Sequence, residues 1–155
     1  MQRTGTLLAL SLLFAVLAIG CEDHLRQSRG IWPWAPTEVR FHRLSRFLDR
    51  DGVELLSLRV EFLDRDGDPV KFSGDVMFKV EPDSTLREDW RFSYDLSDLK
   101  VNARHWDHVT STYRFEIEVG WDDPPLPETR IRVRITADSP ETGQLEAGIT
   151  VRRGD

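Results

Sequence analysis

Three aspartates at alternate positions come closest to the spacing of a metal site. Asp64, Asp66 and Asp68 lie in the segment DRDGD, and this is how the first ligands of an EF-hand loop are spaced. Pro69, however, occupies the position where that loop needs glycine, and strand patterns rather than helices flank the segment. Weak Ca²⁺ binding by these carboxylates is one hypothesis, and an ordinary Asp-Gly turn is the alternative.

A second cluster of chemically active side chains is the segment His105-Trp106-Asp107-His108. It offers two imidazoles and a carboxylate, but zinc needs three or four ligands in a fixed geometry. No other His or Cys lies near it in the sequence, and His42 could approach only through the fold. A loop held by histidine–backbone hydrogen bonds is the better interpretation, with Trp106 covering the open end of the core.

The sequence lacks the patterns that are typical of catalysis. It has no Gly-x-Ser-x-Gly and no glycine-rich phosphate loop, and no pair of acids stands out as a general acid and base. Its charged residues, such as Arg130, Arg132 and Arg134, alternate with apolar ones and are typical of solvated cross-strand pairs. We therefore expect no catalytic residue, no cofactor and no enzymatic activity.

Three tryptophans lie in irregular, proline-rich segments. Trp32 and Trp34 flank a proline, and Trp121 precedes the segment DDPPLP. Exposed indole rings in such segments could stack on sugars, which predicts a carbohydrate-binding module as one alternative function. The other interpretation is structural. Trp32 and Trp34 would then pack on the domain or lie in the lipid headgroup layer, and the prolines after Trp121 would stiffen a turn.

The N-terminus has the pattern of a secretory signal peptide. Arg3 is its only charge, and Leu7 to Ile19 form an apolar run that is shorter than the roughly 20 residues a membrane-spanning helix needs. The run ends in Leu17-Ala18-Ile19-Gly20-Cys21, which resembles the lipobox of bacterial lipoproteins, with Leu one position earlier than usual. That resemblance implies cleavage before Cys21 by signal peptidase II and lipid attachment to its thiol.

The N-terminal pattern divides the chain into residues 1–20 as signal peptide, 21–36 as a lipidated tether and 37–155 as the folded domain. The chain has 155 residues and a single cysteine, which excludes an internal disulfide. Cleavage removes no charge except Arg3, so the net charge changes from −6 to −7. An acidic chain of this kind is not expected to bind nucleic acid.

From residue 37 onward, apolar residues recur at every second position. Seven segments show this alternation, which predicts half-buried antiparallel strands: 37–48, 53–63, 74–81, 88–96, 110–119, 129–137 and 144–152. The phase slips near Leu44, where a bulge or kink is expected. Asp-Gly and proline turns separate the segments, and none has a convincing helical period. We therefore expect an all-β, seven-stranded Ig-like (Greek-key) β-sandwich, in which residues 97–109 cross between the sheets.

The lipobox, the segment GDPVK at 67–71 and the segment WDHVTSTYRF at 106–115 together resemble the small uncharacterised Ig-like lipoproteins of bacterial envelopes. The resemblance implies this fold for the mature chain and no particular activity. The expected protein is exported, lipid-anchored to the bacterial cell membrane or outer membrane, and faces away from the cytoplasm. A non-enzymatic domain that binds or scaffolds an envelope protein is the first functional hypothesis. Sugar binding and a calcium-stabilised adhesion domain are the alternatives.

Overall fold

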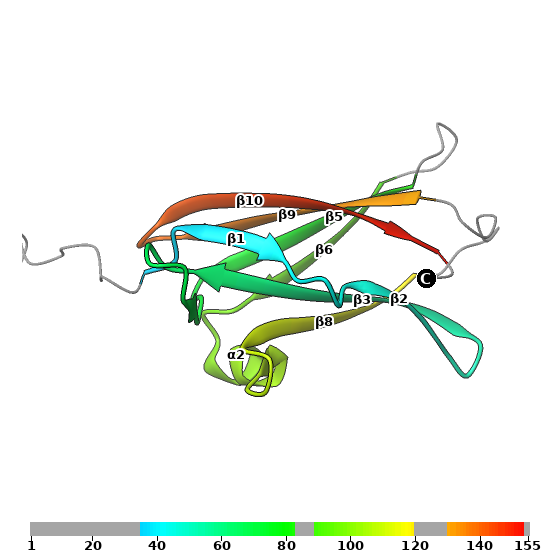
Figure 1. Ribbon diagram of the computed structural model, residues 1–155, viewed down its shortest axis with the longest axis horizontal. Helices are drawn as coiled ribbons and strands as arrows, with labels where there is room; N and C mark the ends of the chain where they lie inside the picture. Colours follow the sequence, from blue (N-terminus) through cyan, green and yellow to red (C-terminus); the bar gives the residue numbers. More distant parts are fainter. Residues whose placement is uncertain (1–34, 83–88, 120–129, 154–155) are drawn as a thin grey trace, which may run out of the picture. The chain divides into compact units, whose positions relative to one another are not determined.

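The computed structural model describes residues 35–82, 89–119 and 130–153. All described residues belong to one compact unit, Trp34–Asp155. Its elements, shown in Figure 1, are β1 (Glu38–Phe41), β2 (Arg46–Arg50), β3 (Val53–Leu63), β4 (Pro69–Val70), β5 (Asp75–Pro82), β6 (Trp90–Asp95), α2 (Leu99–His105), β7 (Trp106–Asp107), β8 (Thr112–Glu118), β9 (Arg130–Ser139) and β10 (Gly143–Arg152).

The strands form two antiparallel sheets that pack face to face. One sheet has the order β1-β3-β8-β7, with β2 and β4 also paired to β3, and the other has the order β10-β9-β5-β6. The hairpin between β2 and β3 turns at Asp51 and Gly52, whose φ angles of 56° and 82° are those of a tight hairpin turn. The two sheets and their connections make the fold an Ig-like β-sandwich, as the alternation predicts.

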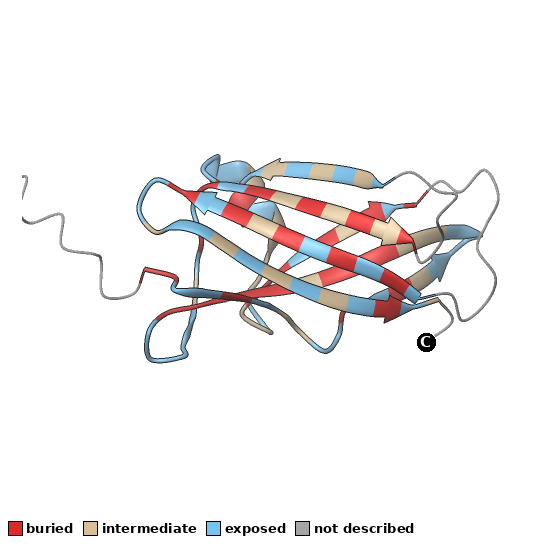
Figure 2. Ribbon diagram, turned by 90° about the horizontal axis from the view of Figure 1, so that it is seen from above, coloured by how far each residue is buried: buried red, intermediate tan, exposed pale blue. Residues whose placement is uncertain are grey.

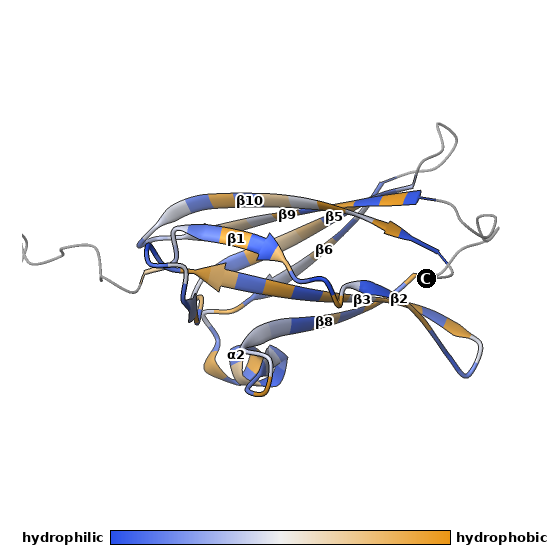
Figure 3. Cartoon of the chain, viewed as in Figure 1, coloured by the Kyte–Doolittle hydropathy of each residue, from blue (hydrophilic) through white to orange (hydrophobic). Residues whose placement is uncertain are grey.

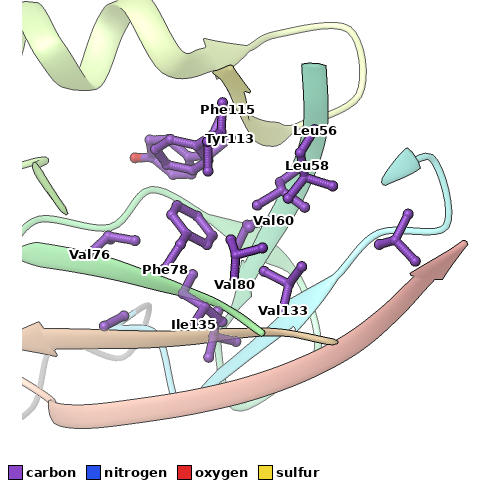
Figure 4. Packing of buried hydrophobic residues seen from close by; sticks show 14 of the residues in the cluster. Leu56, Leu58, Val60, Val76, Phe78, Val80, Tyr113, Phe115, Val133 and Ile135 are labelled. Atoms are coloured by element: carbon purple, nitrogen blue, oxygen red, sulfur yellow. The ribbon is translucent and has the colours of Figure 1, made fainter. Parts of the chain in front are cut away.

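The core lies between the sheets and is built from the residues that alternate along each strand. Figures 2 and 3 show buried, apolar positions alternating with exposed, polar ones along the strands. Figure 4 shows the centre of the core, where side chains of β3, β5, β8 and β9 interlock: Leu56, Leu58, Val60, Val76, Phe78, Val80, Tyr113, Phe115, Val133 and Ile135. The Phe78 and Phe115 rings, one from each sheet, meet edge to face at 4.8 Å between centroids.

The first predicted strand is divided in two. β1 and β2 both pair with β3, and residues 42–45 leave the sheet between them. His42 and Ser45 hold this break, because the Ser45 N–H donates to the His42 carbonyl at 3.0 Å and the Ser45 hydroxyl lies 3.1 Å from the Arg59 carbonyl. The slip in the alternation near Leu44 is therefore a real interruption.

The expectation of a domain without helix is wrong at one place. Residues 97–109 do cross from one sheet to the other, but they include the helix α2, which packs against β6 and β8. Asp98 starts the helix, since its carboxylate accepts the N–H groups of Lys100 and Val101 at 2.7 and 3.2 Å. With only seven residues, α2 is too short to show a helical period in the sequence.

Candidate functional site

The Asp64 carboxylate closes a turn. Its Oδ1 accepts the backbone N–H groups of Asp66 and Asp68 at 2.9 and 3.0 Å, and the side chain is buried while those of Asp66 and Asp68 are exposed. The structure thus gives Asp64 the turn-forming role of the alternative interpretation. Among the described residues, no three His, Cys, Asp or Glu side chains lie close enough together to hold a metal ion. Calcium binding by this turn stays a prediction.

The side chains of the His-Trp-Asp-His segment point to different neighbours. The His105 ring stacks on Phe115 at 4.6 Å, and its Nδ1 lies 2.8 Å from the Arg114 carbonyl oxygen. Trp106 is half-buried and meets the Tyr113 ring at 5.0 Å, so it covers the edge of the core as expected. His105 therefore packs and bonds within the domain, whereas His108 is exposed and contacts the Trp106 ring at 6.3 Å between centroids, so the two imidazoles face different neighbours.

Asp107 belongs to a polar cluster on the outer face of the first sheet. Its Oδ2 accepts a hydrogen bond from the Arg59 guanidinium at 2.6 Å, and Thr110 and Thr112 also accept from that guanidinium. The Arg59 hydrogen bond, reinforced by the backbone N–H of Val109, holds the pKa of the Asp107 carboxyl well below its ordinary value. Asp107 therefore stays ionised and fixes the loop that follows β7, which is a structural role.

The remaining predicted site residues lie outside the described residues. They are Cys21, the predicted lipid-attachment residue, and the three candidate stacking tryptophans, Trp32, Trp34 and Trp121.

The strongest candidate for a binding surface lies on the outer face of the four-stranded sheet. Along β9, exposed residues alternate with buried ones, so Arg130, Arg132 and Arg134 project from the same face. Neighbouring strands add further cations there. We call this cluster the arginine face, and it consists of Lys79, Arg91, Arg130, Arg132, Arg134 and Arg152.

Strand register places cations beside cations on the arginine face. Arg130 of β9 faces Arg152 of β10, and Arg134 faces Lys79, which in turn faces Arg91. Like charges directly opposite each other destabilise a sheet, so the pairing of Arg130 with Arg152 adds no stability to the sandwich. Opposite charges also meet in register: Arg132 faces Glu81 on this sheet. On the other sheet, Arg40 and Glu61 form an ion pair of 2.6 Å.

Carboxylates neutralise only part of the arginine face. Glu81 binds both Lys79, at 2.7 Å, and Arg134, and these two hydrogen bonds lower the pKa of the Glu81 carboxyl. Lys79 also binds Asp89 at 2.7 Å. In the described part of the chain, no ion pair reaches the other four cations, which are Arg91, Arg130, Arg132 and Arg152.

The arginine face is hollowed rather than flat. One hollow, of about 190 Å³, is lined by Glu81, Pro82, Arg130, Arg132 and Thr150. A second hollow, of about 520 Å³, is lined by Met77, Lys79, Arg134, Ile135, Thr136, Glu146, Ala147 and Gly148. Thr150 faces Arg132 and Gly148 faces Arg134, so the two hollows lie in successive rows of the same strand pair. We call them together the trough.

The sequence alone marked these arginines as outward-facing but not as a site. The expectation that they form cross-strand pairs with acids is confirmed for Arg134, which binds Glu81. Arg132 lies opposite Glu81 in the register, but neither it nor Arg130 has an ion pair within the described residues. The available signal was three arginines at alternate positions in a chain of net charge −6. What the sequence cannot supply is the register that sets Arg152 opposite Arg130.

Comparison with known proteins does not identify a family for this chain. No protein-family model matches the chain, and no curated protein matches it. Among solved structures, the FN5 domain of Drosophila Lar is similar, with 14% sequence identity and a TM-score of 0.36 over 79% of this chain and 98% of that one. The assignment as an Ig-like β-sandwich rests on the two sheets and their pairing.

Proposed function

We propose that the protein is an exported lipoprotein, anchored through Cys21, whose Ig-like β-sandwich is a non-enzymatic module that binds a protein partner in the cell envelope. Residues 1–20 act as the signal peptide, residues 21–36 as the tether and residues 37–155 as the binding domain. The anchor part of the proposal rests on the sequence, where the only cysteine follows the apolar run after a single glycine, Gly20.

The binding part of the proposal rests on the arginine face. Four guanidinium groups that have no ion pair among the described residues lie on one exposed sheet surface, although the chain as a whole is acidic. Arginine is enriched in protein interfaces because its planar group makes paired hydrogen bonds to carboxylates. The interior, by contrast, is filled with apolar side chains from both sheets. A surface of this kind fits recognition better than catalysis.

A membrane location needs the lipid anchor in this proposal. Within the described residues, no helix is long and apolar enough to cross a membrane. Each buried CH₂ of an acyl chain contributes about 0.8 kcal/mol to membrane binding, so two or three chains on Cys21 make a stable anchor.

Replacing Cys21 with Ser should move most of the protein from the membrane fraction to the soluble exported fraction, because the hydroxyl cannot carry the diacylglyceryl thioether. The measurement is fractionation of cells that express either form, followed by immunoblotting. Equal melting temperatures of the soluble Cys21→Ser protein and the detergent-extracted wild type would show that the domain is intact. Unchanged retention of Cys21→Ser in the membrane would contradict the anchor.

A further inference from the structure

We propose that the arginine face binds an extended acidic segment of the partner protein, which lies along β9 and β10 in the trough above Gly148. This inference rests on the proposed function and names the chemistry of the partner.

Charge is the first argument for an acidic partner. Arg130, Arg132 and Arg152 have no ion pair in the described part of the chain, and Arg130 directly faces Arg152. Carboxylates from outside would relieve this repulsion and would form charge-assisted hydrogen bonds with the guanidinium groups. The opposite end of the same face carries Asp75, Asp95 and Asp138 in one row, so an acidic segment is attracted to the arginine end only.

Spacing is the argument for an extended conformation. Outward side chains recur along β9 at every second residue, which is about 6.6–6.8 Å. A peptide in extended conformation presents every second side chain on one face with the same repeat. Acidic residues at alternate positions therefore match Arg130, Arg132 and Arg134 one to one.

The lining of the trough favours a protein segment over an anionic polysaccharide. Beside Lys79 and Arg134, the larger hollow is lined by Met77, which is half-buried on the same face of the sheet, and by one carboxylate, that of Glu146. An acidic peptide can bring an apolar side chain to Met77 while its carboxylates reach the arginines. A charged polysaccharide offers only the second of these contacts.

Gly148 supplies the space for the segment. It lies at an exposed position in the middle of β10, where its lack of a side chain leaves the second hollow open. A Cβ at this position would meet only the Val133 carbonyl oxygen at 3.8 Å and Arg134 Cγ at 3.9 Å, which are ordinary contacts. Packing within the domain therefore does not require glycine here. A β-branched residue suits the middle of a strand better than glycine does.

The test uses the full lipidated chain in detergent micelles at low salt, with fluorescence anisotropy of two labelled ten-residue peptides. One peptide alternates Glu and Val, and the other has five Glu followed by five Val, so both carry the same charge. We expect the alternating peptide to bind about tenfold more tightly, and the Arg130→Gln/Arg132→Gln double variant to lose about tenfold or more of that affinity. Arg114→Gln, an exposed arginine on the other sheet, should bind like the wild type.

The Gly148→Val variant tests whether peptide binding can be lost while the domain stays folded. It should weaken binding of the alternating peptide by about tenfold without lowering the melting temperature, whereas Gly148→Ala should bind like the wild type. Equal affinity for the two peptides, or no effect of Gly148→Val, would overturn the inference. The inference would also be overturned if polyphosphate bound more tightly than the alternating peptide and Gly148→Val left that binding unchanged. It would be overturned as well if the chain associated with itself and the double variant abolished this association. Membrane release of Cys21→Ser does not depend on any of these results, so the anchor and the inferred partner can fail separately.

Discussion

Replacing Gly74 with Ala should lower the free energy of unfolding by about 2–6 kcal/mol, from backbone strain and steric overlap together. Gly74 directly precedes β5 and has a φ of 149°, a conformation that residues with a Cβ rarely adopt. An added Cβ would lie 2.2 Å from the backbone oxygen of Asp138 and 3.0 Å from Cζ of Phe72.

The overlap at Gly74 cannot be relieved by a side-chain rotation, because the nearest atom belongs to the backbone of β9. Asp138 pairs with Asp75, so moving it disturbs the ladder between β5 and β9. The Gly74 carbonyl also accepts the Leu96 N–H at 2.8 Å, and this hydrogen bond ties the start of β5 to the end of β6. Any shift of Gly74 away from Asp138 would weaken it.

Urea unfolding of Gly74→Ala and of a matched control, Gly143→Ala, measures this effect. Gly143 also has a positive φ, of 73°, but a Cβ there would meet nothing within 4 Å. The control therefore carries backbone strain alone, of about 1–3 kcal/mol, and the difference between the two variants reports the overlap with Asp138. Equal stability of the two variants would show that β9 yields to the extra methyl group.

Replacing Asn102 with Asp should destabilise the domain by about 3–5 kcal/mol at neutral pH, because it leaves a buried charge without a partner. Asn102 is the buried residue of α2, and both the nitrogen and the oxygen of its side-chain amide are hydrogen-bonded. Nδ2 donates to the carbonyls of Phe72 and Leu96, both at 2.7 Å, and Oδ1 accepts from the Tyr113 hydroxyl at 2.9 Å. The Tyr113 oxygen in turn accepts the Phe72 N–H at 3.0 Å.

The network around Asn102 joins α2, β8 and the segment before β5, so it fixes the crossing between the sheets. Asp has the same shape, but it would turn an oxygen toward two carbonyl oxygens that now accept N–H groups. Ala103→Asp is the control, since Ala103 is exposed and this change adds the same charge on the same helix. If Asn102→Asp melts within a degree or two of Ala103→Asp, the network does not hold the crossing in the way argued here.

The fold could be predicted because each long strand carries its own alternation. Six of the seven predicted strands are present as single strands, and β3 has the predicted bounds of 53–63. The first is divided into β1 and β2, and the two-residue strands β4 and β7 were not predicted. The helix α2 was missed because its position depends on one buried amide, Asn102, rather than on a row of apolar residues. Its local signal was the Ser97-Asp98 pair, since Asp98 caps the helix.

Features that depend on which strands meet could not be predicted. Leu145, Ala147 and Ile149 alternate as cleanly as the residues of β9, yet they are only half-buried, because β10 lies at the edge of its sheet. The arginine face likewise arises from register, which brings cations of β5, β6, β9 and β10 together. A sequence shows which side chains face outward, but only the paired sheet shows which charges they meet.

Photo-crosslinking in intact cells tests the central claim, that the anchored sandwich binds a protein through its arginine face. A photoreactive residue replaces Thr150, which lines the trough on β10, or Glu118, which is exposed on β8 of the other sheet. We expect a discrete protein adduct from position 150 that the Arg130→Gln/Arg132→Gln double variant abolishes, and none from position 118. Equal adducts from both positions, or none from position 150, would contradict the account.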